Sequence, residues 1–245
     1  MAYQAVFKRY ELKFLLTLEQ KDRVLEAITP YMQLDRYGRS SIRNIYFDTD
    51  TYRLIRRSIE KPLYKEKLRL RSYGKADKNT SIYVEVKKKF QSVVYKRRIA
   101  MTEQNAMAWL TEDHSRHDGS QIGNEIQYFL DFYKTLKPVL FLSYEREAYY
   151  ATDGSDFRVT FDDNILCRQE ALTLDSRVYG TPILPENMVL MEIKCSGGIP
   201  LWMTEILSRE KLYKTSYSKY GTAYQTILFP QRRAEAQKCE VITND

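Results

Sequence analysis

Cysteine, histidine and long apolar runs are scarce in this chain of 245 residues. Its three cysteines, Cys167, Cys195 and Cys239, are isolated and lack the spacing of metal ligands, so we expect free thiols in a reducing compartment. No stretch approaches the roughly 18 apolar residues that a membrane-spanning helix needs, and the N-terminus lacks the apolar core of a signal peptide. We therefore expect a cytoplasmic protein.

Glycine-dependent catalytic motifs are also missing. The chain has no GxGxxG, GxxxxGK[ST] or GxSxG pattern, which argues against dinucleotide-binding, P-loop and serine-hydrolase chemistry. The two histidines, His114 and His117, lie three residues apart beside Asp113 and Asp118 and could hold a metal. A solvated helix end is the more common role for such a group, and we favour it here.

Basic residues outnumber acidic ones. The 39 Lys and Arg against 32 Asp and Glu give a formal net charge of +7, which favours a polyanionic partner such as nucleic acid, polyphosphate, a nucleotide or an acidic membrane. Twenty tyrosines favour strands. Because no internal repeat or linker is visible, we expect a single domain over residues 1–245, with a core at about 7–229 and a frayed polar tail at 231–245.

Residues 66–89 contain two alternating runs joined by a turn-forming segment. Side chains two apart on a strand share a face, so Arg69 and Arg71 would project together from one strand, and Glu85 and Lys87 from the next. The Gly and Asn residues between them predict a β-hairpin. Cations about 5 Å apart repel by roughly 1 kcal/mol in water and about 3 kcal/mol at an effective dielectric of 20, which favours an anionic ligand. A single such hairpin would more commonly be a solvated sheet face, so the recurrence of the pattern is decisive.

The same alternation recurs along the chain. The pairs that would share a face are Glu11/Lys13, Arg69/Arg71, Glu85/Lys87, Lys96/Arg98, Tyr144/Arg146, Arg158/Asp162 and Glu192/Lys194. Amphipathic helices are predicted between these strands. Together they predict an α+β fold: an inside-out barrel of about eight strands, with a polar lumen and helices packed outside. Cations crowded in such a lumen would be tolerable only with a bound polyanion and a few carboxylates, and linear polyphosphate matches this requirement.

Three acidic residues accompany these cations. For Glu11 and Glu85 we favour salt bridges to neighbouring Lys or Arg residues. For Glu192 we favour a metal ligand, because a divalent cation that bridges phosphate oxygens needs a carboxylate. A salt bridge remains the alternative for Glu192.

An ordered set of short segments resembles a known family. The segments are RYELK at 9–13, LRLRSYG at 68–74, VEVK at 84–87, YER at 144–146, FRVTFD at 157–162, MEIK at 191–194 and YSKY at 217–220. They resemble the VTC domain, the polyphosphate polymerase domain of the vacuolar transporter chaperone family, within the CYTH-like triphosphate tunnel metalloenzyme superfamily. The resemblance runs from Phe7 to about Phe229.

This resemblance implies an eight-stranded antiparallel tunnel in which the γ-phosphate of ATP is transferred to a growing polyphosphate chain with a divalent metal, Mn²⁺ or Mg²⁺. It implies that Glu192 binds the metal and that Lys219, Lys194, Arg69 and Arg71 are catalytic. The implied phosphate-binding residues are Lys13, Arg69, Arg71, Lys87, Lys96, Arg98, Tyr144, Arg146, Arg158, Lys194 and Lys219. From the sequence alone, Lys219 would instead be an exposed lysine in the first turn of a helix.

The opening strand departs from the pattern of some relatives. Those that hydrolyse triphosphate or cyclise nucleotides carry ExExK, whereas the first position here is Arg9. The loss of one metal-binding acid argues against a two-metal hydrolase and suits the VTC branch. The helical extension and membrane segments that accompany the domain in eukaryotes are lacking, so we expect product translocation to need a separate membrane-protein partner.

Three other functions use the same residues. A tripolyphosphatase or nucleoside triphosphatase would need the same cations, so the sequence separates it poorly from a polymerase. A catalytically silent polyphosphate-binding module would need no metal. Nucleic-acid binding would need basic and aromatic residues on an open face, and charge alternation on closed strands argues against it. All tunnel hypotheses require that Arg69, Arg146 and Arg158 converge.

Overall fold

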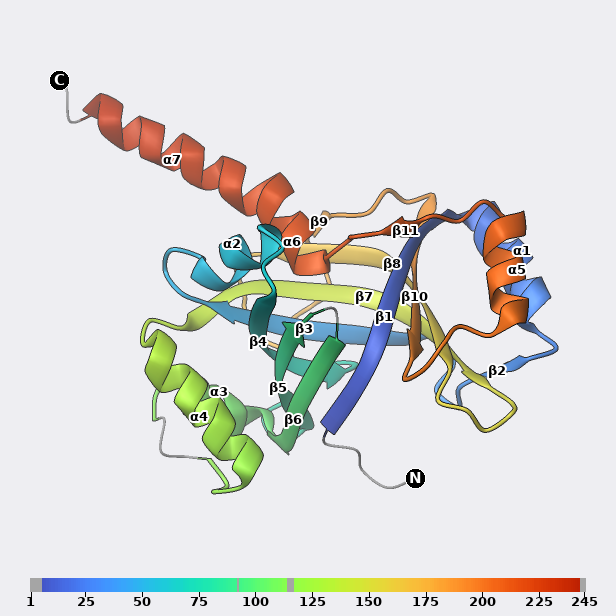
Figure 1. Ribbon diagram of the computed structural model, residues 1–245. Helices are drawn as coiled ribbons and strands as arrows, with labels where there is room; N and C mark the ends of the chain where they lie inside the picture. Colours follow the sequence, from blue (N-terminus) through green and yellow to red (C-terminus); the bar gives the residue numbers. More distant parts are fainter. Residues whose placement is uncertain (1–5, 92, 114–116, 243–245) are drawn as a thin grey trace.

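Eight long antiparallel strands close into a tunnel in the computed structural model, which describes residues 6–91, 93–113 and 117–242 (Figure 1). The strands are β1 (Val6–Thr17), β3 (Ser40–Asp48), β4 (Tyr64–Tyr73), β5 (Ser81–Phe90), β6 (Val93–Thr102), β7 (Lys137–Ala151), β8 (Arg158–Arg168) and β10 (Met188–Cys195). They pair in the order β7, β3, β4, β5, β6, β1, β10, β8, and β8 pairs back to β7. Short strands β2 (Met32–Leu34), β9 (Thr181–Pro182) and β11 (Lys214–Thr215) extend the same sheet. The predicted α+β tunnel is confirmed.

Helices lie around the closed sheet, and the last one projects away from it (Figure 1). They are α1 (Leu18–Ile28), α2 (Arg53–Ile59), α3 (Glu103–Thr111), α4 (Gln121–Tyr133), α5 (Leu201–Arg209), α6 (Lys219–Ala223), the π-helix η1 (Tyr224–Leu228) and α7 (Phe229–Ile242). In Figure 1, α3 and α4 lie beside β5 and β6, and α1 and α5 lie together at the opposite end of the molecule. None of these described helices has both the length and the apolar character that crossing a membrane requires.

The alternation of the strands decides which face turns inward. Leu68 and Leu70 of β4 and Val84 and Val86 of β5 are buried in the core beneath α3 and α4. Since alternate side chains point to opposite faces, Arg69 must point into the tunnel. A one-residue slip of register would move its guanidinium into this apolar core, so the register is strongly specified.

Helix α6 and η1 pack on one end of the closed sheet. The ring of Tyr220 stacks on Tyr46 with ring centroids 4.7 Å apart. Ala223 and Leu228 join the buried cluster that contains Ile55 of α2. Lys219, in the first turn of α6, is thereby brought to the tunnel rather than to solvent.

The C-terminal segment differs from the frayed tail that we expected at 231–245. Helix α7 continues from η1 to Ile242 and leaves the body as a rod (Figure 1). Arg, Ala, Glu, Gln and Lys are strong helix formers, and Pro230 falls in the first turn, where its missing N–H is tolerated. These propensities account for a helical backbone up to Ile242.

The predicted histidine pair lies partly outside the residues that the structure describes. His114 lies outside the described residues, and His117 Nδ1 accepts a hydrogen bond from the Gly119 backbone N–H at 3.1 Å. Among the described residues, no group of three or more His, Cys, Asp and Glu side chains is placed to hold a metal ion.

Candidate functional site

Cationic side chains from the tunnel wall converge on its interior. The strands supply Lys13, Lys67, Arg69, Arg71, Lys87, Lys96, Arg98, Arg146, Arg158 and Lys194, and α6 supplies Lys219. The predicted convergence of Arg69, Arg146 and Arg158 is found. Arg69 and Arg146 both interact electrostatically with Tyr144, and the pKa of Arg158 is lowered by burial and, to a smaller extent, by the neighbouring Arg146. The residues predicted to bind phosphate lie on strands of the tunnel wall or, for Lys219, on α6.

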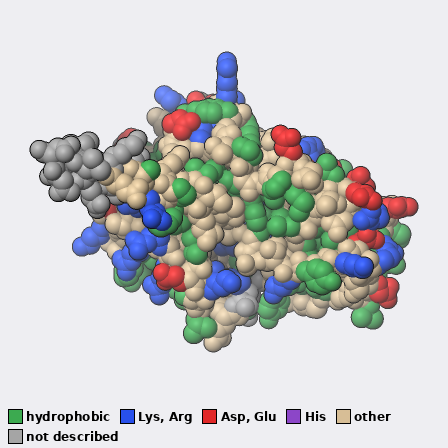
Figure 2. Space-filling view, turned by 90° about the horizontal axis from the view of Figure 1, so that it is seen from above, with side chains coloured by type: hydrophobic (Ala, Val, Ile, Leu, Met, Phe, Trp, Pro, Cys, Tyr) green, Lys and Arg blue, Asp and Glu red, His purple; other side chains and the backbone are tan. Residues whose placement is uncertain are grey.

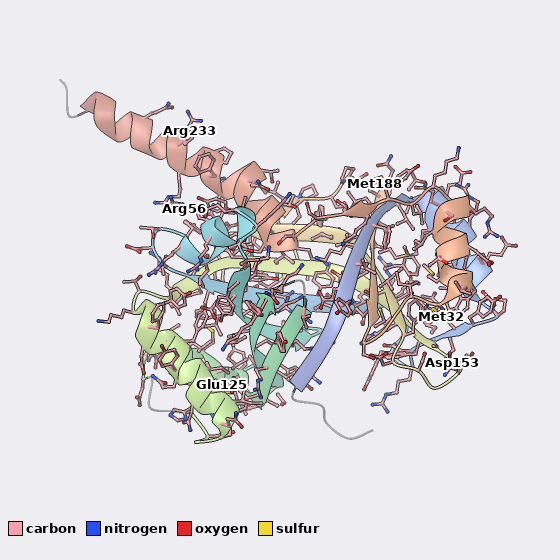
Figure 3. The ribbon with its side chains drawn as sticks, viewed as in Figure 1. Met32, Arg56, Glu125, Asp153, Met188 and Arg233 are labelled. Carbon is pink, nitrogen blue, oxygen red and sulfur yellow. The ribbon has the colours of Figure 1, made fainter. Side chains whose placement is uncertain are left out.

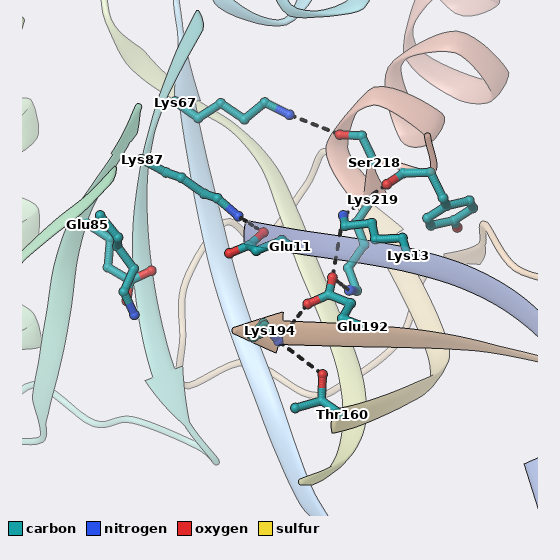
Figure 4. Close-up of polar contacts among 12 residues, drawn as sticks. Glu11, Lys13, Lys67, Glu85, Lys87, Thr160, Glu192, Lys194, Ser218 and Lys219 are labelled. Atoms are coloured by element: carbon teal, nitrogen blue, oxygen red, sulfur yellow. Dashed lines mark hydrogen bonds and ion pairs between the residues drawn. The ribbon is translucent and has the colours of Figure 1, made fainter. Parts of the chain in front are cut away.

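Glu192 stands at the centre of this surface, surrounded by cations (Figure 4). Its carboxylate lies 2.8 Å from Lys194 Nζ, 3.3 Å from Lys219 Nζ, 3.4 Å from Lys13 Nζ and 3.5 Å from Arg146 Nη2. Burial would raise the pKa of Glu192, but these cations hold it well below the ordinary value. The salt-bridge alternative that the sequence left open for Glu192 is thus what the structure contains.

Asp162 is a second buried carboxylate, which we did not assign to the site from the sequence. Arg146 donates to both of its oxygens at 2.6 Å, and Lys219 Nζ donates to Oδ2 at 2.5 Å. Burial opposes the charge on Lys219, but Asp162 and Glu192 raise its pKa overall. The expectation of an exposed Lys219 was wrong: its side chain is 8% exposed.

Glu85 organises a third group of charges. It is fully buried and accepts from Arg69 at 2.7 and 2.9 Å, with Lys96 Nζ at 3.6 Å and Arg71 Nη1 at 3.8 Å. Burial would raise the pKa of Glu85, but Arg71 and Arg69 lower it strongly. The predicted salt-bridge role of Glu85 agrees with these contacts.

Neutral groups orient the two arginines of β4. Arg71 donates through Nε to Asn44 Oδ1 and through Nη2 to the Tyr144 hydroxyl, both at 3.0 Å. Arg69 Nη1 donates to the Tyr46 hydroxyl at 3.0 Å. These bonds orient both guanidinium groups, whose charge is paired with Glu85 in this structure.

Lysines occupy the part of the tunnel next to α6. Lys87 pairs with Glu11 at 2.7 Å, and the pKa of Glu11, which burial would raise, is lowered to about 2 by Lys87 and its neighbours. Lys67 donates to Ser218 Oγ at 2.9 Å, and burial beside Lys13 and Lys87 places its pKa well below the ordinary value (Figure 4). Lys67 was missed from the sequence, although it has the same parity on β4 as Arg69.

Two further lysines have pKa values near neutrality. Burial lowers the pKa of Lys96 and of Lys194 to about 7 in each case, against the attraction of Glu85 and Glu192 respectively. Lys194 Nζ also donates to Thr160 Oγ1 at 3.0 Å. An anion entering the tunnel would return these lysines to the charged form, because it supplies the charge that burial lacks.

A buried carboxylate at the end of β3, Asp48, positions α6. Asp48 accepts from the backbone N–H groups of Leu54 and Ile55 at 2.9 and 3.0 Å, which ties it to α2. The Tyr220 hydroxyl donates to Asp48 Oδ2 at 2.9 Å. Since Tyr220 follows Lys219 directly, Asp48 holds the helix that carries Lys219 into the tunnel.

Cations are in excess over carboxylates in this interior. Its carboxylates, Glu11, Glu85, Asp162 and Glu192, are outnumbered by the cations named above. Phosphoryl transfer depends mainly on alignment and on electrostatic stabilisation of the phosphate oxygens, which such a surface can provide. By contrast, on the outer face seen in Figure 2, Lys and Arg are interspersed with acidic and hydrophobic side chains.

Glu192 could supply one oxygen to a divalent cation. Mg²⁺ sites at triphosphates commonly use one or two carboxylates, substrate oxygens and water, so a single buried carboxylate fits this chemistry. The four surrounding cations limit that fit, because at least one of them would have to release Glu192. A site made of protein groups alone is not present among the described residues.

Comparison with known protein families identifies the family of this chain. The family model described as the VTC domain matches residues 8–228. The chain belongs to the VTC domain family. The VTC resemblance predicted from seven short segments is therefore confirmed over nearly the whole chain. No curated protein matches it.

Solved structures of similar fold support the tunnel architecture. A candidate adenylate cyclase from Bacillus halodurans shares 16% identity with a TM-score of 0.54, over 88% of this chain and 96% of that chain. HpAC1, a candidate adenylyl cyclase from Hippeastrum with a dominant triphosphatase activity, shares 14% identity with a TM-score of 0.53, over 89% of this chain and 95% of that chain. At these identities the likeness concerns the fold alone.

Proposed function

We propose that this VTC domain is an ATP-dependent polyphosphate polymerase, which transfers the γ-phosphate of ATP to the end of a polyphosphate chain inside the tunnel. One observation carries the proposal: Lys219 and Arg146 share Asp162 inside a channel whose cations outnumber its carboxylates. This excess of positive charge suits a string of phosphates. Membership of the VTC family supports the same activity.

In the proposed reaction, a terminal oxygen of the polyphosphate chain attacks the γ-phosphorus of ATP. The bond from that phosphorus to the β–γ bridging oxygen breaks, a new P–O–P linkage forms, and ADP leaves. Arg69, Arg71 and Arg146 would hold phosphate oxygens with their planar donor groups. Lys194 and Lys219 would lie against the transferring phosphate, where their charge offsets that of the transition state.

A divalent cation would neutralise phosphate charge and keep attacking and leaving oxygens in line when bound. Glu192 is the carboxylate that we propose as its protein ligand. Lys13 and Lys194 would then shift from Glu192 to phosphate oxygens, so the positive charge now around Glu192 would be redistributed rather than lost. A cytoplasmic location and a membrane partner for export remain predictions from the sequence.

Incubation of the pure protein with ATP and Mn²⁺ or Mg²⁺ tests the proposal. We expect ADP and long polyphosphate, and we expect Lys219→Met to lose this product while the exposed-lysine variant Lys211→Met keeps it. Polyphosphate formation in the absence of ATP turnover, or full activity of Lys219→Met, would contradict the proposal.

A triphosphatase is the second candidate, supported by the triphosphatase activity of the structurally similar HpAC1. In that reaction water replaces the phosphate acceptor, and the same incubation would release only orthophosphate. A non-catalytic polyphosphate-binding module would give neither product, and would bind polyphosphate equally well after Glu192→Gln without any metal requirement.

A further inference from the structure

Ser218 carries a partly buried hydroxyl group that the proposed transfer does not use. The residue lies directly before Lys219, and its Oγ caps α6 by accepting a hydrogen bond from the Gly221 backbone N–H at 3.2 Å. Lys67 Nζ, from β4, lies 2.9 Å from the same oxygen (Figure 4). Among the described residues, no oxygen atom accepts the O–H of Ser218, which leaves Lys67 Nζ as the group within reach of that proton.

Lys67 has no carboxylate to hold its charge. Lys13 and Lys219 lie 3.4 and 3.3 Å from Glu192, whereas no carboxylate in the part of the chain that the structure describes forms an ion pair with Lys67. Burial, together with repulsion from Lys13 and Lys87, holds the pKa of Lys67 well below its ordinary value. The neutral amine, which has a free electron pair, is therefore favoured at this position.

An amine within hydrogen-bond reach of a serine hydroxyl can activate the serine as a nucleophile. The amine takes the proton as the oxygen attacks, which is the part that lysine plays as the base in Ser–Lys pairs. Both members of the pair are fixed in place here. Lys67 is held by β4, and Ser218 is held by α6, which the Tyr220 hydroxyl ties to Asp48 at 2.9 Å.

Ser218 also lies next to the groups that would hold the transferring phosphate. Lys219 directly follows it and reaches Glu192 at 3.3 Å inside the tunnel. Lys13 Nζ donates to the Tyr217 carbonyl at 2.9 Å and lies 3.4 Å from Glu192, so this segment borders the same carboxylate from both sides of Ser218. A phosphate held by Lys13 and Lys219 would therefore lie beside the hydroxyl of Ser218.

Resting on the proposed binding of ATP in the tunnel, we infer that Ser218 is a self-phosphorylation site and that Lys67 is the proton acceptor of this reaction. Lys67 takes the proton of Ser218 Oγ, this oxygen attacks the γ-phosphorus of ATP, and the bond from that phosphorus to the β–γ bridging oxygen breaks. The products are phosphoserine, ADP and an ammonium group on Lys67, so the proton and the charges balance.

The surrounding charges favour this product. A bound phosphate favours the charged form of a neighbouring lysine, so ATP binding makes Lys67 a stronger base. Phosphoserine carries about −1.5 to −2 charges at neutral pH and would pair with the ammonium groups of Lys67, Lys13 and Lys87. The repulsion that Lys13 and Lys87 exert on Lys67 would thereby be relieved.

Labelling of the full chain with γ-³²P-ATP and Mg²⁺, without polyphosphate, tests the inference. After denaturation we expect an acid-stable phosphoryl group, which peptide mass spectrometry should place on Ser218. Acid stability separates phosphoserine from a phosphate on a lysine nitrogen, which acid removes. Ser218→Asn keeps a helix cap but has no hydroxyl, so it should lose the label. The exposed Ser216→Ala is the matched control and should keep it.

Lys67→Arg separates a proton acceptor from a positive charge. The guanidinium keeps the charge but does not accept a proton, so we expect labelling to be about a hundredfold slower. Thermal denaturation with tripolyphosphate checks that the variants of Ser218 and Lys67 are folded and bind phosphate. The assignment of the label on the wild type by mass spectrometry depends on neither variant.

A wild type without acid-stable phosphate, or a Ser218→Asn variant that keeps it, would overturn the inference. An unchanged labelling rate in Lys67→Arg would overturn the role of Lys67. A protein that makes polyphosphate without phosphoserine would keep the polymerase and refute self-phosphorylation. A protein that carries phosphate on Ser218 but makes no polyphosphate would refute the polymerase and leave this inference standing.

Discussion

Replacing Asp162 by Asn tests whether the cations that Asp162 pairs with inside the tunnel can bind a phosphate ligand instead. The change keeps the shape of the side chain but removes the carboxylate that Arg146 and Lys219 share at 2.5 to 2.6 Å. Removing one partner of a buried ion pair costs about 3 to 5 kcal/mol, because the remaining cations keep only the more distant Glu192. For a domain of this size we expect the melting temperature to fall by roughly 6 to 20 °C.

The same variant should respond more strongly to tripolyphosphate than the wild type. Arg146 and Lys219 would have lost their carboxylate, so phosphate oxygens would replace it and recover part of the lost stability. At a hundred times its Kd the ligand adds about 2.7 kcal/mol to the free energy of unfolding, and this gain should be larger in the variant at equal ligand concentration. Thermal denaturation with and without tripolyphosphate measures both effects.

The neighbouring residue provides the control. Asp163 points outward and pairs with the half-exposed Arg39, so Asp163→Asn should cost at most about 1 kcal/mol and leave the ligand response unchanged. The pKa of Asp162 is lowered in the fold, since Arg146 and Lys219 outweigh its burial. Its contribution is therefore present above the ordinary pKa of 3.8 and is lost as pH falls below it, so the wild type and Asp162→Asn should converge in acid. Equal stability of Asp162→Asn and Asp163→Asn at pH 7, or equal responses of these two variants to tripolyphosphate, would refute the reasoning.

Two further predictions concern protons and the position of α6. Burial lowers the pKa of Lys96 and Lys194 from 10.5 to about 7, so the free energy of unfolding should decrease as pH falls from about 10 to 7. Binding of tripolyphosphate at pH 8 should therefore take up protons, which calorimetry in two buffers of different ionisation heat measures. No proton uptake would mean that both lysines are already charged and would contradict the prediction. Tyr220→Phe keeps the ring but removes the hydrogen bond to Asp48, so we expect the free energy of unfolding, measured with denaturant, to fall by about 1.5 to 3 kcal/mol. Because Lys219 would lose its alignment, we also expect a lower kcat with little change in KM. A raised KM with kcat intact would contradict this role.

The strand alternation predicted a barrel with a polar interior and the inward direction of several charged side chains. A half-buried strand exposes alternate residues to one face, so Arg69, Glu85, Arg146 and Glu192 could be placed inward from parity alone. Arg97 looked like a defect in that pattern. It points outward and pairs at 3.4 Å with Glu125 on α4, which lies outside the sheet (Figure 3).

Features that depend on tertiary packing were not predictable in this way. The burial of Lys219 depends on the contact between Tyr220 and Asp48, which lie 172 residues apart in the chain. Asp162 had the right parity, but only the three-dimensional arrangement showed that it binds both Arg146 and Lys219. Lys67 also had the right parity, and a stricter use of alternation along β4 would have found it.

The central claim is that one cation-lined channel binds phosphates end to end, and a crystal structure with a non-hydrolysable ATP analogue and Mn²⁺ tests it most directly. We predict a triphosphate inside the tunnel, contacting Arg69, Arg146 and Lys219. A triphosphate bound to the outer surface, with the interior ion pairs of Glu192 and Asp162 unchanged, would contradict the account.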